Sequence, residues 1–165
     1  MGMSYPGGVH LDKIAEQGDE NAFTLPHPTV QGSPFDFSFS GLKTAVINLI
    51  HNASQKGEQL PVADLSASFR KAVVDCLLKN VILAMNDTNY KKLVIAGGVS
   101  ANSLLRRRLQ QECKEKGWEI HMPALNLCGD NAAMVGAQAY YEFLAGKIAG
   151  MDLNACAAMP IDNNF

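Results

Sequence analysis

Two glycines followed by a serine and an asparagine form the part of this chain best suited to binding chemistry. The stretch from Lys92 to Asn102 predicts a short apolar strand, a turn at Gly97 and Gly98, and the start of a helix. Backbone N–H groups exposed in such a turn, beside a helix N-terminus, commonly hold nucleotides and other anions. The alternative is an ordinary strand-to-helix turn that needs glycine for its backbone angles, because neither a P-loop nor the full dinucleotide pattern is present.

Polar side chains stand beside this turn and at the start of a later helix. Ser100 is predicted to cap the helix that follows the glycines, and the Asn102 amide can both donate and accept hydrogen bonds. Asp130 precedes Asn131 and a further predicted helix. A carboxylate in that position is more often a helix cap than a metal ligand, so the residues alone favour the cap.

Periodicity along the chain predicts the elements that position these residues. Strict alternation of aromatic and polar residues over 35–40 indicates a half-buried strand, and the widest apolar stripe, over 65–85, indicates a helix buried on much of its surface. Gly117 is predicted to end a helix. The other predicted elements are helices near 11–16, 42–50, 100–116 and 131–144, and strands over 93–96 and 118–122.

This order predicts an α/β fold in which neighbouring strands are parallel. Only about three strands are predicted, fewer than a self-sufficient sheet usually has. The chain also starts inside a Gly-rich turn at Pro6, Gly7 and Gly8. We therefore expect a piece of a larger protein with an unpaired sheet edge, and an exposed edge of that kind favours a homo-oligomer.

Composition restricts the possible environments of the chain. The 165 residues are 47% hydrophobic and 18% charged, with a net charge of −2, so no overall field attracts nucleic acid. The four cysteines contain no CxxC pair, which favours a reducing, cytoplasmic compartment over zinc or a disulfide framework. No apolar run is long enough for a membrane span, and the first residues do not resemble a signal peptide.

Four blocks in order carry a family resemblance: Tyr5 to Gly8 with Asp12, then residues 35–44, 96–102 and 128–134. Phe-Ser-Phe-Ser-Gly-Leu-Lys-Thr and Gly-Gly-Val-Ser-Ala-Asn are long and distinctive. From about Met3 to Gly146 the sequence resembles the second half of the catalytic subunit of tRNA threonylcarbamoyladenosine synthase, the TsaD/Gcp family. These proteins were formerly described as O-sialoglycoprotein endopeptidases, or glycoproteases.

The resemblance implies a fold and a reaction. It implies part of an actin/hexokinase/Hsp70-like (ASKHA, ribonuclease H-like) lobe with an incomplete sheet, over residues 1–146, followed by a tail over 147–165. The whole enzyme would move a threonylcarbamoyl group from threonylcarbamoyl-adenylate to the N6 amine of the adenosine next to the anticodon of tRNAs that read ANN codons. Accessory subunits of the bacterial synthase complex would be partners.

The resemblance also implies site residues. Gly8, Asp12 and Asn102, with Gly97 and Gly98, match positions that bind the adenylate, and Asp130 matches a carboxylate ligand of an iron or zinc ion. Without the resemblance, Asp12 is simply a solvated carboxylate and the glycines are turn residues. No general base is recognisable, so we assign no catalytic residue.

The sequence departs from the family pattern in ways that bear on activity. Val9 replaces a common proline and Gly129 a common threonine. The family's metal-binding histidines, four residues apart, have no counterpart, because no two of His10, His27, His51 and His121 have that spacing. The family's other phosphate-contacting loop is also absent. We therefore expect this chain alone to be inactive and not to retain the metal ion.

Other readings remain open. A metallo-glycoprotease would need a recognisable nucleophile or a HExxH motif, and neither is present. A noncatalytic scaffold related to the enzyme would not need the 128–134 block, which is intact. Arg106, Arg107 and Arg108 could contact tRNA phosphates, but a solvated helix face is at least as good an explanation. The remaining candidates, Lys43, His121 and Cys128, are interpreted as a surface lysine and two structural residues.

Overall fold

The computed structural model describes residues 1–158 and divides into two compact units, Met1–Cys128 and the residues from Gly129 onward. We call them the first and second unit and describe each by itself. Part of the tail expected over 147–165, namely residues 159–165, lies outside the described residues. The family-based domain over residues 1–146 stays a proposal.

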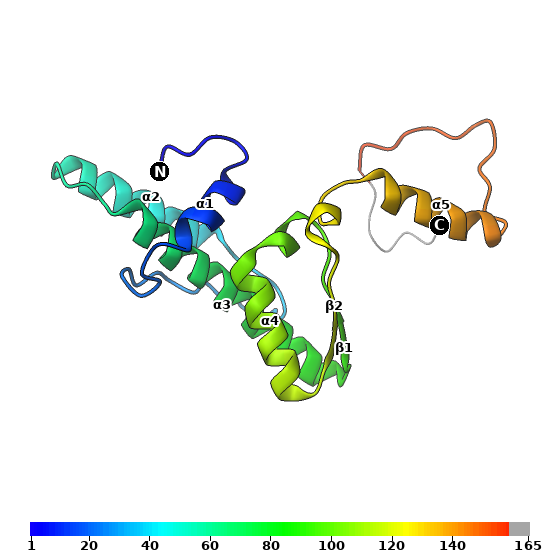
Figure 1. Cartoon of the computed structure of the whole chain (residues 1–165), viewed down its shortest axis with the longest axis horizontal. Helices are drawn as coiled ribbons and strands as arrows, with labels where there is room; N and C mark the ends of the chain where they lie inside the picture. Colours follow the sequence, from blue (N-terminus) through cyan, green and yellow to red (C-terminus); the bar gives the residue numbers. More distant parts are fainter. Residues whose placement is uncertain (159–165) are drawn as a thin grey trace. The chain divides into compact units, whose positions relative to one another are not determined.

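The described residues form a mixed α/β chain of helices with one small sheet (Figure 1). In chain order the elements are α1 Gly7–Ala15, α2 Ser40–Gln55, α3 Val62–Thr88, β1 Lys92–Val94, η1 Gly98–Ala101, α4 Ser103–Lys116, β2 Glu119–His121, η2 Leu125–Leu127 and α5 Ala132–Leu144. Every predicted helix is present.

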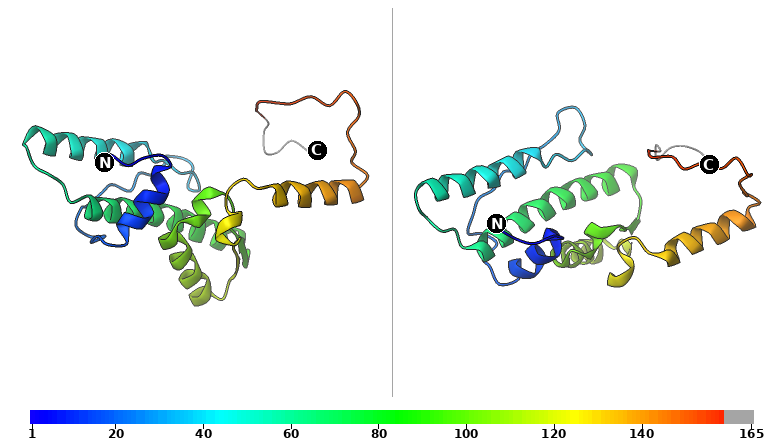
Figure 2. Two further views of the ribbon diagram at one scale, coloured as in Figure 1. Left: turned by 45° about the horizontal axis from the view of Figure 1, so that its top comes forward. Right: turned by 90° about the horizontal axis from the view of Figure 1, so that it is seen from above.

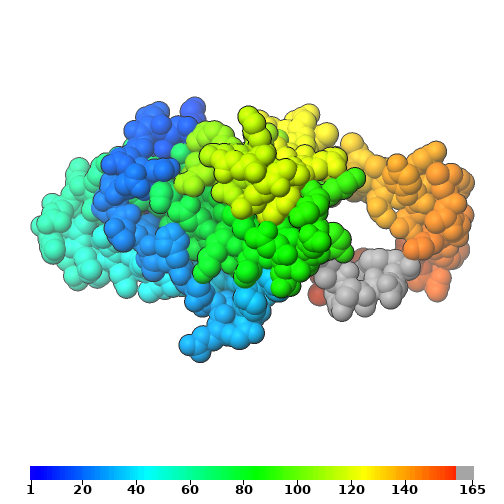
Figure 3. All heavy atoms as spheres, turned by 90° about the horizontal axis from the view of Figure 1, so that it is seen from below, coloured from blue at the N-terminus to red at the C-terminus, as the bar shows by residue number. Residues whose placement is uncertain are grey.

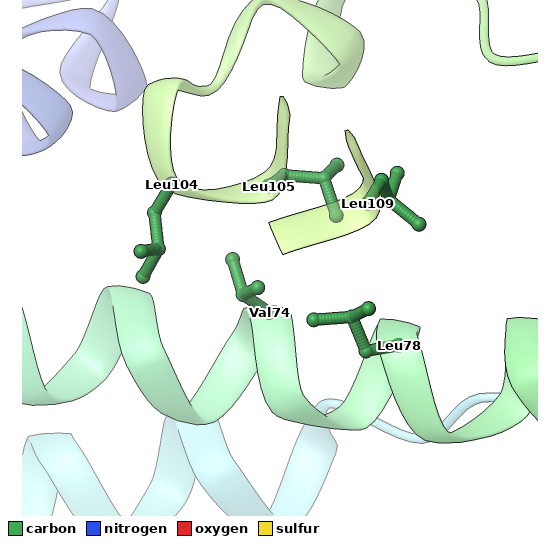
Figure 4. Packing of buried hydrophobic residues seen from close by; sticks show 5 residues of the cluster. All are labelled: Val74, Leu78, Leu104, Leu105 and Leu109. Atoms are coloured by element: carbon green, nitrogen blue, oxygen red, sulfur yellow. The ribbon is translucent and has the colours of Figure 1, made fainter. Parts of the chain in front are cut away.

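The helix α3 is the centre of the first unit. It runs for 27 residues and buries residues on several sides, as its wide apolar stripe predicts. Val74 and Leu78 pack against Leu104, Leu105 and Leu109 of α4. Figure 4 shows Leu104, Val74 and Leu78 pointing into the space between the two helices. Burying apolar surface on this scale is the main force that can hold short helices in place.

A different face of α3 packs against α2. The two helices run side by side in both views of Figure 2, and Leu42 and Val46 of α2 share a buried cluster with Ala72 of α3. Leu25, from the connection between α1 and α2, completes that cluster. Two of the three buried residues of α2 therefore lie in the cluster that it shares with α3.

The sheet consists of β1 and β2 in parallel, with Leu93 opposite Ile120. The parallel pairing confirms the prediction from the strand–helix–strand order. Leu93 and Ile120 pack against the cluster formed by Met85, Cys113 and Trp118. Gly117, with φ of 67°, ends α4 in the left-handed conformation that the sequence predicts.

The predicted strand over 35–40 is wrong. Residues 36–39 form neither helix nor strand, and α2 begins at Ser40. A strand needs a neighbour to accept its backbone hydrogen bonds, and no strand pairs with this segment in the described part of the chain. Phe37 and Phe39 instead stack on each other, with ring centroids 6.2 Å apart. The alternating pattern therefore reflects contacts between aromatic side chains, not the hydrogen-bonded pairing of strands.

The second unit contains α5, and none of the helix's residues is buried. Asn131 caps it by accepting a hydrogen bond from the Met134 N–H at 3.0 Å. Over residues 1–158, no helix is both long and apolar enough to cross a membrane. All four cysteines are free, with Cys113 and Cys128 buried and Cys156 exposed.

Exposed strand edges and apolar side chains lead to a prediction about assembly. Within residues 1–158, each strand of the two-stranded sheet has an unpaired edge, and Val94 in β1 is 70% exposed. Because such edges recruit further chains, we expect a homo-oligomer at low micromolar concentration. Sedimentation velocity should show association, and Val94→Lys should weaken it by placing a charge at the edge. A concentration-independent monomer would contradict this expectation.

Candidate functional site

A hollow of about 470 Å³ lies in the first unit where the N-terminal ends of several helical elements meet. We call it the α1–α4 hollow. Its lining includes Gly8, Asp12, Gly98 and Asn102, and Leu125 contributes from η2. Figure 3 shows α1 (blue) and the η1–α4 segment (yellow-green) on one face of the first unit. Four of the six predicted site residues are therefore brought together, while their role in binding stays a prediction.

The glycines at this hollow have two different structural roles. Gly97 has φ of 81°, which residues with a side chain rarely adopt, so it shapes the turn and does not line the hollow. Gly8 and Gly98 do line it, and an added Cβ at either would meet no atom of the chain within 4 Å. Open space at these two positions is what close approach of a ligand to the main chain requires.

Asn102 caps α4, which corrects the prediction that Ser100 does so. The Asn102 Oδ1 accepts a hydrogen bond from the Leu105 N–H at 2.9 Å. Ser100 is buried, and its hydroxyl donates to the Gly97 carbonyl at 2.6 Å. The short helix η1 occupies the turn where the sequence predicts the first residues of α4, so the cap falls two residues later.

Asp12 is tied to the start of α4 by both carboxylate oxygens. Its Oδ1 accepts from Asn102 Nδ2 and from Ser103 Oγ, each at 3.1 Å. Its Oδ2 accepts from the Ser103 N–H at 3.0 Å, one of the N–H groups that the helix leaves unpaired. A carboxylate at a helix N-terminus is also favoured by the helix dipole. Sequence reasoning found Asp12 but not this role in joining α1 to α4.

Arg70 is the residue that sequence reasoning missed. It lies on α3 one turn before Val74, within the buried stripe, and is only 5% exposed. Its Nη1 is 3.0 Å from Asp12 Oδ1 and 2.6 Å from Glu16 Oε1. The sequence did contain a signal: Arg70 stands at helical spacing inside an apolar stripe. A charged residue is rarely buried in such a stripe unless it has a partner.

Glu16 has a strongly perturbed carboxyl group. A hydrogen bond from Ser103 and one from Arg70 lower the Glu16 pKa to about 2, and the nearby charges of Arg70 and Arg107 act in the same direction. The carboxylate therefore stays charged across all ordinary conditions and can hold its partners throughout.

The three consecutive arginines do not form a simple solvated face. Arg106 donates to the Ser100 carbonyl at 2.9 Å and to the Pro123 carbonyl at 3.0 Å, joining the loops that follow β1 and β2. Arg107 pairs with Glu16 at 3.2 Å, and Arg108 lies 3.6 Å from Asp75. The helix turns these side chains toward acidic and carbonyl groups of neighbouring elements, so all three contribute to tertiary structure.

An apolar groove of about 670 Å³ adjoins the α1–α4 hollow. Gly8, Val99 and Asn102 line both spaces, and the floor of the groove comes from the apolar face of α3. Lys43, exposed in the first turn of α2, contributes the only lysine of this lining. A ligand in the hollow would therefore have a polar side near Asp12 and an apolar side toward α3.

The sixth predicted residue, Asp130, belongs to the second unit and is exposed. Asn131, not Asp130, caps α5. Within residues 1–158, no three His, Cys, Asp or Glu side chains are grouped so that they could hold a metal ion. The other two polar candidates have local partners: His121 lies 2.8 Å from Glu119, and Cys128 donates to the Ala124 carbonyl at 3.5 Å.

Sequence comparison supplies the family. The model of the family described as TsaD, tRNA N6-adenosine threonylcarbamoyltransferase, matches residues 1–137. The chain belongs to the TsaD family. A member from Clostridium botulinum (strain Kyoto) that carries the same name is 45% identical over 155 residues. Members so named from Moorella thermoacetica and Listeria welshimeri are 41% and 46% identical.

The match covers most of this TsaD-family chain but only part of each relative. The match with the Clostridium botulinum protein includes 94% of this chain and 46% of that protein. The match with the Moorella thermoacetica protein includes 98% of this chain and 47% of that protein. The chain thus spans about half the length of the curated relatives it matches. Membership of the family confirms the resemblance drawn from the four sequence blocks.

The Glu16 pKa predicts how the stability of this TsaD-family chain depends on pH. A carboxyl group whose pKa falls from 4.5 unfolded to about 2 folded stabilises the protein above pH 4.5 and loses that effect as the pH falls toward 2. Glu16→Gln should therefore lower the free energy of unfolding at pH 7, by about 1 kcal/mol after solvent screening. The difference should shrink toward zero near pH 2.

Urea unfolding of both proteins between pH 2 and 7 measures this difference. Glu20→Gln is the matched control, because Glu20 is similarly exposed and only approaches Arg108 at 4.0 Å. A Glu16→Gln difference that stays constant over the whole pH range would contradict the assignment.

Proposed function

We propose that this chain is part of a tRNA-modifying transferase that moves a threonylcarbamoyl group from threonylcarbamoyl-adenylate to the N6 amine of an adenosine next to the anticodon. One observation carries the proposal: Gly8 and Asp12 near the start of the chain and Gly98 and Asn102 far along it line a single hollow. The names of the relatives agree with it. The finer fold assignment, part of an ASKHA lobe with an incomplete sheet, belongs to the same proposal.

The α1–α4 hollow has the groups that an adenylate needs. The N-terminal N–H groups of α1 have no side-chain cap, and together with the open main chain at Gly98 they suit a phosphate. Among the described residues, Asp12 Oδ2 accepts a hydrogen bond only from the Ser103 N–H, so this oxygen retains capacity for a ribose hydroxyl. Asn102 Nδ2 uses one hydrogen on Asp12 and has a second to donate.

In the proposed reaction the adenosine amine attacks the carbonyl carbon of the mixed anhydride. A C–N bond forms, the bond between that carbon and the phosphate oxygen breaks, AMP leaves, and the amine loses a proton. The residues of this chain would bind and orient the adenylate, which lowers the barrier by fixing the electrophile in place. No side chain of the described residues is assigned as general base.

A metal ion does not fit the described residues alone. Iron or zinc in this kind of site takes at least three protein ligands, and the described residues offer no such group. Asp130 would supply one oxygen ligand, with the others coming from outside this chain. The tRNA substrate, the synthase accessory subunits and a cytoplasmic location are part of the proposal.

A peptidase has less support. Cys76 Sγ lies 3.7 Å from His27 Nδ1, which is the arrangement of a thiol and a base. Burial raises the Cys76 pKa, and the charge of Asp75 raises it further. An activated nucleophile needs the opposite shift. A noncatalytic scaffold would not need the open hollow around Gly8 and Gly98.

Transfer activity should require the part of the enzyme that this chain does not contain. The 165-residue chain should add no threonylcarbamoyl group to tRNA when given the purified adenylate. A chimera with the unmatched part of the Clostridium botulinum relative should restore transfer, measured by mass spectrometry of tRNA nucleosides. Asn102→Ala should abolish transfer in the chimera, and exposed Asp87→Ala should not. An inactive but folded chimera, or full activity with Asn102→Ala, would refute the proposal.

Metal retention gives a separate prediction. After dialysis the chain should hold far less than one equivalent of iron or zinc, because a single carboxylate binds a transition metal weakly. Elemental analysis checks this. In the chimera, Asp130→Ala should abolish transfer while leaving the circular dichroism spectrum unchanged. One equivalent of metal on the chain, lost in Asp130→Ala, would mean that the remaining ligands lie within this chain.

A further inference from the structure

Arg70 is the one charged side chain that is buried among residues 1–158, and nothing in the sequence blocks of the family marks it. It comes from the middle of α3, which also forms the floor of the apolar groove. Burying a guanidinium is costly unless its hydrogen bonds are satisfied. Its contacts should therefore show what it is there to hold.

The Arg70 guanidinium contacts α1 and the start of α4 at once. Its Nη1 is 3.0 Å from Asp12 Oδ1 and 3.1 Å from the Asp12 carbonyl, and Nη2 is 3.2 Å from the Ala15 carbonyl. The same Nη1 lies 3.1 Å from Ser103 Oγ at the first residue of α4. Two hydrogens on Nη1 are thus shared among acceptors from two helices, and all of these contacts lie within the first unit.

The short helix α1 is held mainly by its packing against α3, the helix that carries Arg70. It has nine residues, and Ala15 is its only buried one. Helices this short are unstable in isolation and take their position from tertiary contacts. The separation between Gly8 and Asp12 on α1 and Asn102 on the other side of the hollow therefore depends on contacts with α3, and the Arg70 hydrogen bonds are the polar part of those contacts.

The environment of Arg70 is not optimised for stability alone. Its Nε is buried and has no acceptor among the described residues. An apolar residue of similar size would avoid this unsatisfied donor, and replacing buried ion pairs in that way is often neutral or stabilising. What an apolar residue could not do is hold the Asp12 carboxylate in one orientation.

We propose that Arg70 is a positioning residue of the ligand site: it fixes the Asp12 carboxylate so that its Oδ1 holds Asn102 Nδ2 and its Oδ2 faces the start of α4. This inference rests on the proposed function, because the adenylate is the ligand of the site that Arg70 positions. Arg70 does not line the α1–α4 hollow itself. It acts through Asp12, and without it Asp12 and Asn102 would no longer be held as a pair.

Two readouts on the full 165-residue chain test this role. The first needs no ligand: the Asn102 side-chain amide resonances and the hydrogen exchange of the Ser103 N–H report whether Asp12 still accepts from both. The second is the dissociation constant for AMP, measured by NMR titration. The variants are Arg70→Met and Arg70→Lys, which keeps the charge but not the planar fork. The matched control is Arg108→Met, an arginine 3.6 Å from Asp75.

We expect Arg70→Met to shift the Asn102 resonances, to speed exchange at Ser103 and to weaken AMP binding at least about ten-fold. Arg70→Lys should recover only part of the unsubstituted chain's Asn102 and Ser103 signals and only part of its AMP affinity. Arg108→Met should match the unsubstituted chain in all of these measurements. A merely structural role would lower the unfolding temperature of the Arg70 variants yet leave AMP affinity unchanged in the folded chain, and that result would overturn the proposal.

Two further outcomes are also decisive. If Arg70→Met does not fold, then Arg70→Lys and Ser103→Ala, which removes the hydroxyl shared by Arg70 and Asp12, replace it. If the unsubstituted chain binds no AMP, the proposed adenylate site is wrong in this chain. The positioning role is then decided by the Asn102 and Ser103 signals, and unchanged signals in the Arg70 variants would refute it.

Discussion

Burial of the apolar surface of α3 is the interaction on which the first unit depends. The helix Val62–Thr88 packs against α2 on one face and against α4 and the sheet on another. Each of these partners is too short or too polar to be stable alone. Because the candidate site is made from the ends of α1 and α4, its geometry follows from where α3 places those two helices.

The sequence predicted the elements with strong periodicity and missed what depends on a distant partner. The stripe around Val74 and Leu78 and the glycine at 117 lead directly to α3 and the end of α4. The segment 35–40 has the pattern of a strand, but a strand exists only beside another strand, and sequence alternation does not report the neighbour. Phe37 and Phe39 stand two positions apart and stack on each other, so their contact gives the same alternating pattern as a strand.

The candidate site shows the same division. Gly8, Asp12 and Asn102 were predicted through their motifs, and the structure lines one hollow with them. Arg70 belongs to no motif, and its burial follows only from how α1 and α4 approach α3. The cap of α4 lies at Asn102 and not at Ser100 because the turn forms η1, and pattern reasoning is weakest for shifts of one or two residues at helix ends.

The Arg106 contacts have a mechanical consequence. One guanidinium donates to the Ser100 carbonyl in the loop after β1 and to the Pro123 carbonyl in the loop after β2. Moving either loop alone would break a charge-assisted hydrogen bond, so the easier motion carries both loops together. The two loops thus form one stiff unit at the carboxyl ends of the parallel strands, and a force on the glycine turn is transmitted to the chain leading toward Cys128.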